Sequence, residues 1–163
     1  MDGKLRNMTS VYLTKKDKVL LLYREGSRVV NNLWIGSAGG HFEEFELNDA
    51  KACVIREMKE ELGLETDDIE GLALRYVTLR YTKEEIRQNY YFFANLKDDV
   101  SEQLHSSEGV CKWFSIDEIS SLEMPFTAKY VVQHFYSEGC KTEKIYAGVA
   151  TNGRVVFMDL SES

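Results

Sequence analysis

The alternation of apolar and polar positions predicts a chain built mainly from β-strands. Six stretches alternate or run apolar over the length of a strand: 8–14, 19–24, 33–38, 72–81, 86–96 and 110–114. The first two flank a polar turn at residues 15–17, and the two longest flank a turn at residues 83–85. Each of these pairs is therefore predicted to form an antiparallel hairpin, and the longest strands are rich in the Tyr, Phe and Val that favour sheets.

Helical patterns interrupt the strands at three places. Residues 49–62 form the longest pattern, with Asn48 or Asp49 as N-cap and Gly63 as the residue that ends the helix. A capping box over residues 115–118 predicts a short helix, and residues 127–136 have apolar positions at helical spacing. The chain is then expected to end in a β-hairpin, because Asn152-Gly153 separates two apolar runs at 145–150 and 154–160.

Strands interleaved with these helices predict an α+β fold with a mixed sheet and a C-terminal hairpin. The chain has 163 residues, of which 44% are apolar and 12% aromatic, enough for a real core and too apolar for a disordered segment. Repeats, linkers and low-complexity stretches are lacking in the sequence. Residues 1–163 are therefore expected to form one domain.

The predicted helix 49–62 gathers carboxylates on one side. Glu57, Glu60 and Glu61 stand at i, i+3 and i+4, and the apolar residues of the helix fall on the opposite face: Val54, Ile55, Met58 and Leu62. Such clustering costs a few tenths of a kcal/mol per like-charged pair, and a divalent cation would remove this cost. Oxygen ligands without Cys or His favour Mg²⁺, with Mn²⁺ as a substitute. The alternative is an ordinary solvated helix face, since Glu is a good helix former.

The residues around this helix resemble the Nudix box, which is Gly, five residues, Glu, seven residues, then Arg-Glu-apolar-x-Glu-Glu-x-Gly-apolar. Gly40 and Glu46 fit its first part, and the second part fits without a mismatch at Arg56, Glu57, Met58, Glu60, Glu61, Gly63 and Leu64. One departure is that residues 47–55 number nine where the family has seven. Counted back from Arg56, the first Glu of the box would fall on Asn48, whereas counting from the glycine side selects Glu46.

The resemblance implies an α/β/α sandwich and Mg²⁺-dependent hydrolysis of a nucleoside diphosphate linked to another moiety, X. By the same resemblance the metal is held by Glu57, Glu60, Glu61 and the main-chain carbonyl of Gly40. Arg56 is then structural, pairing with a box carboxylate such as Glu60 to fix the helix against the glycine loop, and Glu46 and Gly63 are structural as well. The general base is expected to be Glu60 or Glu61, with Glu108 as the candidate from a later loop against an ordinary exposed acid.

The substrate is less well defined by the sequence. Three segments resemble small bacterial Nudix proteins of the mutator type, described as 8-oxo-dGTP diphosphatases: GGHFE, LNDAKACVIREMKEELG and MPFTAKYVVQHFY. This resemblance implies that the substrate is a purine nucleoside triphosphate, oxidised or not. Four aromatic residues are candidates for stacking on a base, with a core role as the alternative: Tyr90, Tyr91, Phe126 and Tyr130. Arg24 is a candidate phosphate ligand or a surface ion pair, and His41 either approaches a phosphate or serves the loop that contains it.

The net charge of −7 bears on partners. A protein that binds long nucleic acid is usually basic, so a small nucleotide is the expected partner, bound by a monomer or a homodimer. Apolar runs of membrane-spanning length and a signal peptide are lacking in the sequence, and Cys53, Cys111 and Cys140 have no metal-binding spacing. These features predict a cytoplasmic protein with reduced thiols.

Two other functions would also suit a Nudix-like chain. One is a catalytically silent module that senses a nucleotide, which the complete set of box carboxylates disfavours. The other is a pyrophosphohydrolase that acts on an RNA 5′ end, which the acidic net charge disfavours.

Overall fold

The computed structural model describes residues 2–24 and 32–163, and its strands form one mixed sheet. Within these residues the sheet has nine strands, seven of them in the order β3-β2-β1-β6-β5-β8-β9, while β4 pairs with β1 and β7 pairs with β2. Two pairings are parallel, β1 with β6 and β5 with β8, and the others are antiparallel. The strands are β1 (Leu5–Lys15), β2 (Lys18–Arg24), β3 (Trp34–Ile35), β4 (Ala38–His41), β5 (Ile69–Thr82), β6 (Glu85–Leu96), β7 (Gly109–Ser115), β8 (Ile145–Thr151) and β9 (Arg154–Leu160).

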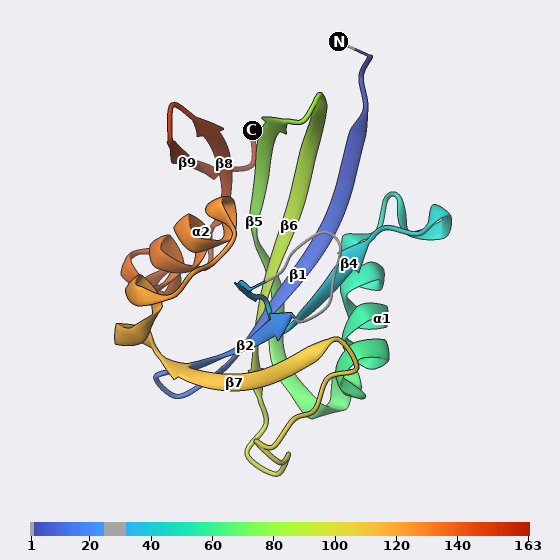
Figure 1. Ribbon diagram of the computed structural model, residues 1–163, viewed down its shortest axis with the longest axis vertical. Coiled ribbons are helices and arrows are strands. Elements are labelled where there is room, and N and C mark those ends of the chain that lie inside the picture. The colour runs from blue at the N-terminus through green and yellow to red at the C-terminus, as the bar shows by residue number, and fades with distance from the viewer. Residues whose placement is uncertain (1, 25–31) are drawn as a thin grey trace.

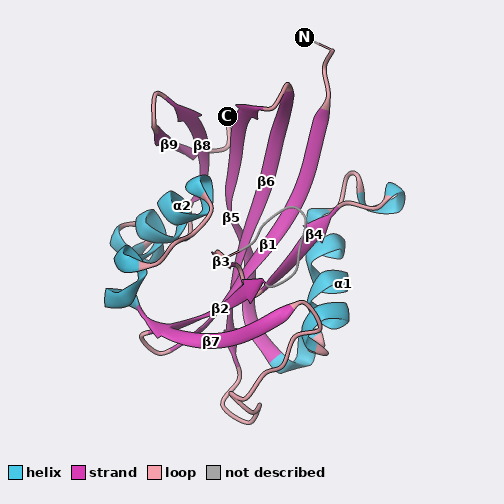
Figure 2. Cartoon of the chain, viewed as in Figure 1, coloured by secondary structure: helices cyan, strands magenta, loops and turns pink. Residues whose placement is uncertain are grey.

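Two α-helices lie on opposite sides of the sheet, α1 (Ala50–Leu62) and α2 (Phe126–Ser137), as Figure 1 and Figure 2 show. Short 3-10 turns complete the chain at Glu44–Glu46 (η1), Thr66–Asp68 (η2), Ile116–Ser121 (η3) and Gly139–Lys141 (η4). The arrangement confirms the predicted α+β class with its mixed sheet between helices. Among the described residues, no helix is long and apolar enough to cross a membrane.

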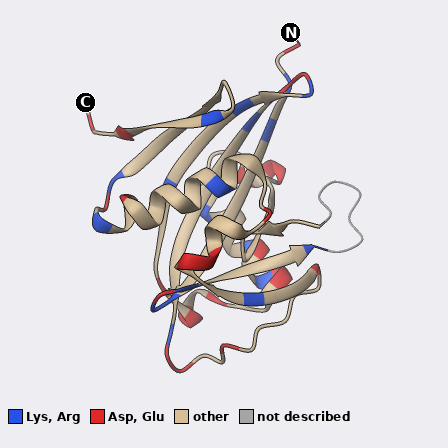
Figure 3. Ribbon diagram, turned by 60° about the vertical axis from the view of Figure 1, so that its left-hand side comes forward, with Lys and Arg blue, Asp and Glu red and all other residues tan. Residues whose placement is uncertain are grey.

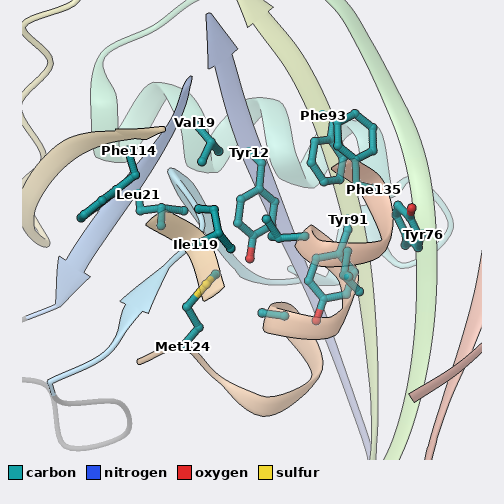
Figure 4. Close-up of a cluster of buried hydrophobic side chains, with 13 residues drawn as sticks. Tyr12, Val19, Leu21, Tyr76, Tyr91, Phe93, Phe114, Ile119, Met124 and Phe135 are labelled. Carbon is teal, nitrogen blue, oxygen red and sulfur yellow. The ribbon is translucent and has the colours of Figure 1, made fainter. Parts of the chain in front are cut away.

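The alternation of side chains along β1 divides the core in two. Val11 and Leu13 point toward α1 and pack with Val54 and Met58 of that helix, whereas Tyr12 points to the other face. On that second face Tyr12, Tyr91, Phe93 and other side chains of the sheet meet α2, where the rings of Phe93 and Phe135 stack with centroids 3.7 Å apart (Figure 4). Each helix therefore covers one face of the central strands.

The predicted hairpins are present, but the first one opens immediately after its turn. β1 and β2 pair only at Thr14 with Val19 and at Lys15 with Lys18, beyond which β2 pairs with β7 and β3. The expected strand at 33–38 is split, because Trp34–Ile35 pairs with β2 and Ala38–His41 pairs with β1. Gly39 and Gly40, which the sequence places in a glycine loop, instead lie within this second strand.

The C-terminal hairpin extends the sheet and docks on α2. β8 lies parallel to β5, and the hairpin turn has Asn152 at φ 47° and Gly153 at φ 75°, as a tight turn of this kind requires. Tyr146 of β8 stacks on Tyr76 with ring centroids 5.4 Å apart, and Phe157 of β9 lies 4.5 Å from the ring of His134. The hairpin thus belongs to the folded core.

Candidate active site

The candidate site forms where β4 passes the exposed side of α1. Asp49 caps the start of α1 by accepting a 3.0 Å hydrogen bond from the Ala52 amide, and Gly63 ends the helix at φ 68°. β4 lies so close to the helix that a Cβ on Gly40 would overlap the carboxylate of Glu57. Glycine at position 40 therefore lets the strand backbone approach the Glu57 carboxylate of the helix.

Arg56 links the helix to the segment before it. Its guanidinium donates two hydrogen bonds to Glu46, from Nε to Oε1 at 2.6 Å and from Nη2 to Oε2 at 3.0 Å. Nη2 also donates to the backbone carbonyl of His41 at 3.1 Å, which ties the helix to the end of β4. Glu46 is fully buried, and the guanidinium beside it lowers the pKa of its carboxyl to about 2. This bidentate pair fixes α1 to the turn η1, and the His41 contact fixes it to the glycine strand β4.

The two ways of aligning the first box glutamate lead to different places in the structure. Glu46, selected from the glycine side, lies in the 3-10 turn η1 and accepts from Arg56, and its Oε2 also accepts from the Glu43 amide at 3.0 Å. Asn48, selected by counting back from Arg56, is exposed. The longer segment between Glu46 and Arg56 is taken up by the turn that leads to the Asp49 cap, so the Glu46–Arg56 contact is kept.

Arg56 also contacts two of the three helix carboxylates. Nη1 donates to Glu57 Oε1 at 2.9 Å and to Glu60 Oε2 at 3.1 Å, whereas Glu61 Oε2 accepts from the Gly39 amide at 3.3 Å. The carboxylates of Glu57 and Glu61 are largely buried, but the Glu60 side chain is 57% exposed. Glu60 is therefore the member of the set that solvent reaches most freely.

Burial and mutual repulsion make two of these carboxyls hard to ionise. Burial raises the pKa of Glu61 to about 7, and the nearby Glu57 adds to this effect. The pKa of Glu57 is also raised, chiefly by burial, although the Arg56 guanidinium acts in the opposite direction. Carboxylates that are costly to ionise side by side in a partly dry site gain from a cation placed between them.

In the structure, however, the three carboxylates are not arranged to coordinate one metal ion. Among the residues described, no group of three or more His, Cys, Asp or Glu side chains lies close enough to hold a metal ion. The reason is visible in the hydrogen bonds: Arg56 holds Glu57 and Glu60, while the Gly39 amide turns Glu61 toward β4. The donor chemistry nevertheless fits a hard cation, because all three groups are carboxylates on one helix face that the backbone of Gly40 approaches.

Glu108 and Arg24, the two candidates outside the box, form an ion pair with each other at 3.3 Å. Both act electrostatically on the box, since Glu108 raises the pKa of Glu61 and Arg24 lowers it. The amide of the neighbouring Ser107 donates to the backbone carbonyl of Glu61 at 3.3 Å, which fastens this loop to α1. An ion pair was one of the two roles that the sequence left open for Arg24, but Glu108 was not predicted as its partner.

The aromatic candidates separate into core and surface residues. Tyr91 is buried and stacks near Tyr12, and Tyr90 packs on Phe42 beside α1, so both serve the core. Phe126 lies at the start of α2 with its ring beneath the Arg80 guanidinium, 4.9 Å away, and beside Tyr130.

The side chain and the backbone of His41 have separate contacts. Its Nε2 accepts a hydrogen bond from Arg6 at 2.8 Å. Its backbone carbonyl accepts the hydrogen bond from Arg56 Nη2. That backbone contact, like the Gly39 amide on Glu61, was missed from the sequence because backbone groups leave no residue signature.

Comparison with known proteins identifies the family by sequence and matches the fold to solved structures. A model of the NUDIX domain matches residues 4–135 of the chain. No curated protein is a significant match by sequence. Among solved structures, the mutator MutT protein from Bacillus halodurans superposes with a TM-score of 0.64 at 19% identity, covering 94% of this chain and 97% of that one.

Two further solved structures superpose equally well. The MutT protein from Methanosarcina mazei has a TM-score of 0.64 at 23% identity and covers 85% of this chain and 98% of its own. An Ap4A hydrolase from C. elegans has a TM-score of 0.64 at 16% identity, with coverages of 85% and 99%. At these identities the likeness is one of fold, and MutT proteins and an Ap4A hydrolase share it.

Proposed function

Because the chain belongs to the Nudix hydrolase family, we propose that it hydrolyses the diphosphate linkage of a purine nucleoside triphosphate in the presence of Mg²⁺. The products would be the nucleoside monophosphate and inorganic diphosphate. The observation that carries the proposal is the set Glu57, Glu60 and Glu61 on the face of α1 that Gly40 approaches. The choice of a triphosphate follows the resemblance of the sequence to mutator-type Nudix proteins, and the oxidised purine 8-oxo-dGTP is included in this class.

In this proposal each box residue has a separate task. Glu57, Glu60, Glu61 and the carbonyl of Gly40 would hold the cation, which neutralises charge on phosphate oxygens and lowers the pKa of water. Arg56 keeps α1 in place through its bidentate contact with Glu46 of η1 and its hydrogen bond to the His41 carbonyl of β4. A water molecule attacks phosphorus, its proton passes to Glu60 or Glu61, and the bond to the leaving phosphate oxygen breaks. Glu108, held by Arg24, is the third candidate for the proton acceptor.

Substrate contacts are proposed on two other elements. Arg24 would hold a phosphate oxygen, exchanging part of its contact with Glu108, since a guanidinium at a strand end beside the carboxylate site suits a phosphate. Phe126, which already carries a cation on its ring, would take one side of a purine base.

A panel of nucleotides tests the function. Nucleoside triphosphates, 8-oxo-dGTP, diadenosine tetraphosphate and a 5′-triphosphorylated RNA oligomer would be incubated with Mg²⁺, and phosphate and diphosphate would be measured. Glu60→Gln and Glu61→Gln should each lose at least ~10²-fold in rate, the scale of lost proton transfer or metal assistance. Glu44→Gln is the matched control, because Glu44 is exposed in η1. Equal rates in all four proteins, or no turnover of any compound, would reject the proposal.

The position of water attack is tested separately. In ¹⁸O-water, attack at the β-phosphorus places the label in the diphosphate, which is the expected result for a mutator-type reaction. Label in the monophosphate would mean attack at the α-phosphorus. Release of single phosphate from a triphosphate would reject the triphosphate diphosphatase proposal while leaving the family membership intact.

A further inference from the structure

The two strands of the C-terminal hairpin are apolar on both faces. Tyr146, Val155 and Phe157 point toward α2 and its core cluster. The alternate residues of the same strands point to the other side of the sheet and are apolar as well: Ile145, Ala147, Val149, Val156, Met158 and Leu160. An antiparallel hairpin with one face in water would carry polar residues there, whereas apolar residues on both faces are typical of strands covered on both sides.

The strand register extends this second face across the sheet. Leu79 of β5 pairs with Val149 of β8, which pairs with Val156 of β9, and Tyr81 follows Leu79 on the same side. We call these positions the outer apolar face: Leu79, Tyr81, Val149, Val156, Met158 and Leu160. All of them are exposed, with Met158 at 71% and Tyr81 at 63%. In the described part of the chain, α1 packs on β1 and β4 and leaves these strands uncovered.

Charge is nearly lacking on this surface. β8 has no charged residue, and β9 has only Arg154 and Asp159, which Figure 3 colours blue and red. Asp159 is two residues from Phe157 in β9, so its side chain lies on the same face, toward α2. There it forms an ion pair with Lys144 at 3.0 Å. Arg154 alone shares the outer side, at one end of the strand. In a chain with 29% charged residues, such a strip is unusual for a surface in contact with water.

We propose that the outer apolar face is a self-association surface, on which a second copy of this chain packs sheet against sheet about a two-fold axis. The area is of the right order: six large side chains that each expose about half of roughly 200 Å² offer on the order of 600 Å² per copy, against the roughly 800 Å² per partner of a standard interface. Two twisted sheets pack well face to face, and an uncharged surface meets its own copy without repulsion.

A membrane is a less suitable occupant of the same face. An amphipathic surface that binds lipid usually has a rim of Lys and Arg for anionic headgroups. Here Arg154 is the one basic residue on that side of the hairpin strands, and the net charge of −7 opposes approach to an anionic bilayer. A second copy needs neither a basic rim nor a net positive charge.

Reversal of charge at the centre of the face tests the proposal. The mass of the full chain would be measured by light scattering after size-exclusion chromatography, from about 1 to 100 µM. Wild type should reach twice the 18.8 kDa of one chain. Val149→Lys and Val149→Glu should each weaken association at least ~10²-fold, because two copies bring like charges together. An equimolar mixture of the two variants should associate again, since opposite charges then meet across the two-fold axis.

The matched control is Gln133→Lys, which adds the same charge at an exposed position of α2 and should leave the mass of the dimer unchanged. Circular dichroism and urea unfolding at 1 µM should show that all three variants fold as wild type does, since Val149 is half-exposed. A monomeric wild type at 100 µM would overturn the proposal. So would a dimer that both Val149 variants preserve, or a monomer that instead binds vesicles of phosphatidylcholine and phosphatidylserine.

Discussion

Glu46 has no exposed surface, and its charge is balanced by the bidentate contact with Arg56. Arg56→Ala should therefore lower the free energy of unfolding by about 3–5 kcal/mol, the range for a buried ion pair broken on one side. Lys51→Ala, at an exposed position of the same helix, is the control and should change it by less than about 0.5 kcal/mol. Urea unfolding at neutral pH measures both. A large loss of activity at an unchanged melting temperature would instead place Arg56 in the substrate site.

The raised pKa of Glu61 makes the stability of the metal-free protein depend on pH. Its pKa is about 7 in the folded protein against an ordinary value of 4.5, so the stabilisation is fully present below pH 4.5 and is lost as pH rises through 7. Between pH 5 and pH 8 the wild type should lose on the order of 1–3 kcal/mol more than Glu61→Gln does. Urea unfolding with a chelator present measures this difference, and the more exposed Glu60→Gln should retain the wild-type slope. The same slope in Glu61→Gln would contradict the assignment.

At the scale of elements, β4 has two close contacts: Gly39 lies against β1, and Gly40 lies against α1. A Cβ on Gly39 would overlap the backbone of Thr9 in β1, which cannot give way, whereas a Cβ on Gly40 would meet only the end of the Glu57 side chain. Gly39→Ala should therefore lower the free energy of unfolding by more than about 2 kcal/mol, within the range for overpacking. Gly40→Ala should retain its fold and lose hydrolytic activity. Melting temperatures and the nucleotide assay would be measured for both variants. Equal losses of stability in Gly39→Ala and Gly40→Ala would contradict this prediction.

The elements that the sequence predicted well are those whose signal is local. Three features depend only on neighbouring residues in the chain: the helical spacing of apolar residues in 49–62, the end of that helix at Gly63 and the Asn152-Gly153 turn. The structure has all three. β4 was not predicted as a strand, because Ala38–His41 has no alternation and owes its conformation to pairing with β1. The Glu46–Arg56 contact could not be predicted for a similar reason. The sequence allowed either Glu46 or Asn48 as the first glutamate position of the box, and only the folded turn η1 selects Glu46.

At the scale of the whole molecule, the C-terminal hairpin lies beyond residues 4–135, the part of the chain that matches the family. Its strands were predicted, but their place beside β5 was not, because a parallel pairing so distant in sequence leaves no local pattern. The contacts that hold it are aromatic: Tyr146 stacks on Tyr76, and Phe157 lies against Tyr76 and His134. Gly148 makes room for this arrangement, since a Cβ there would press on the Phe157 ring.

Phe157 should therefore couple the hairpin to α2 and β5. Phe157→Ala removes a partly buried ring that contacts α2 and β5, so we expect a loss of about 2–3 kcal/mol in the free energy of unfolding, below the 3–5 kcal/mol of a fully buried Phe. Asp159→Asn, on the same side of the same strand, breaks only an exposed ion pair and should leave the free energy of unfolding close to that of the wild type. Hydrogen exchange of the β8 and β9 amides should quicken in Phe157→Ala while α1 stays protected. Equal exchange in both variants would mean that β5 holds the hairpin through backbone pairing alone.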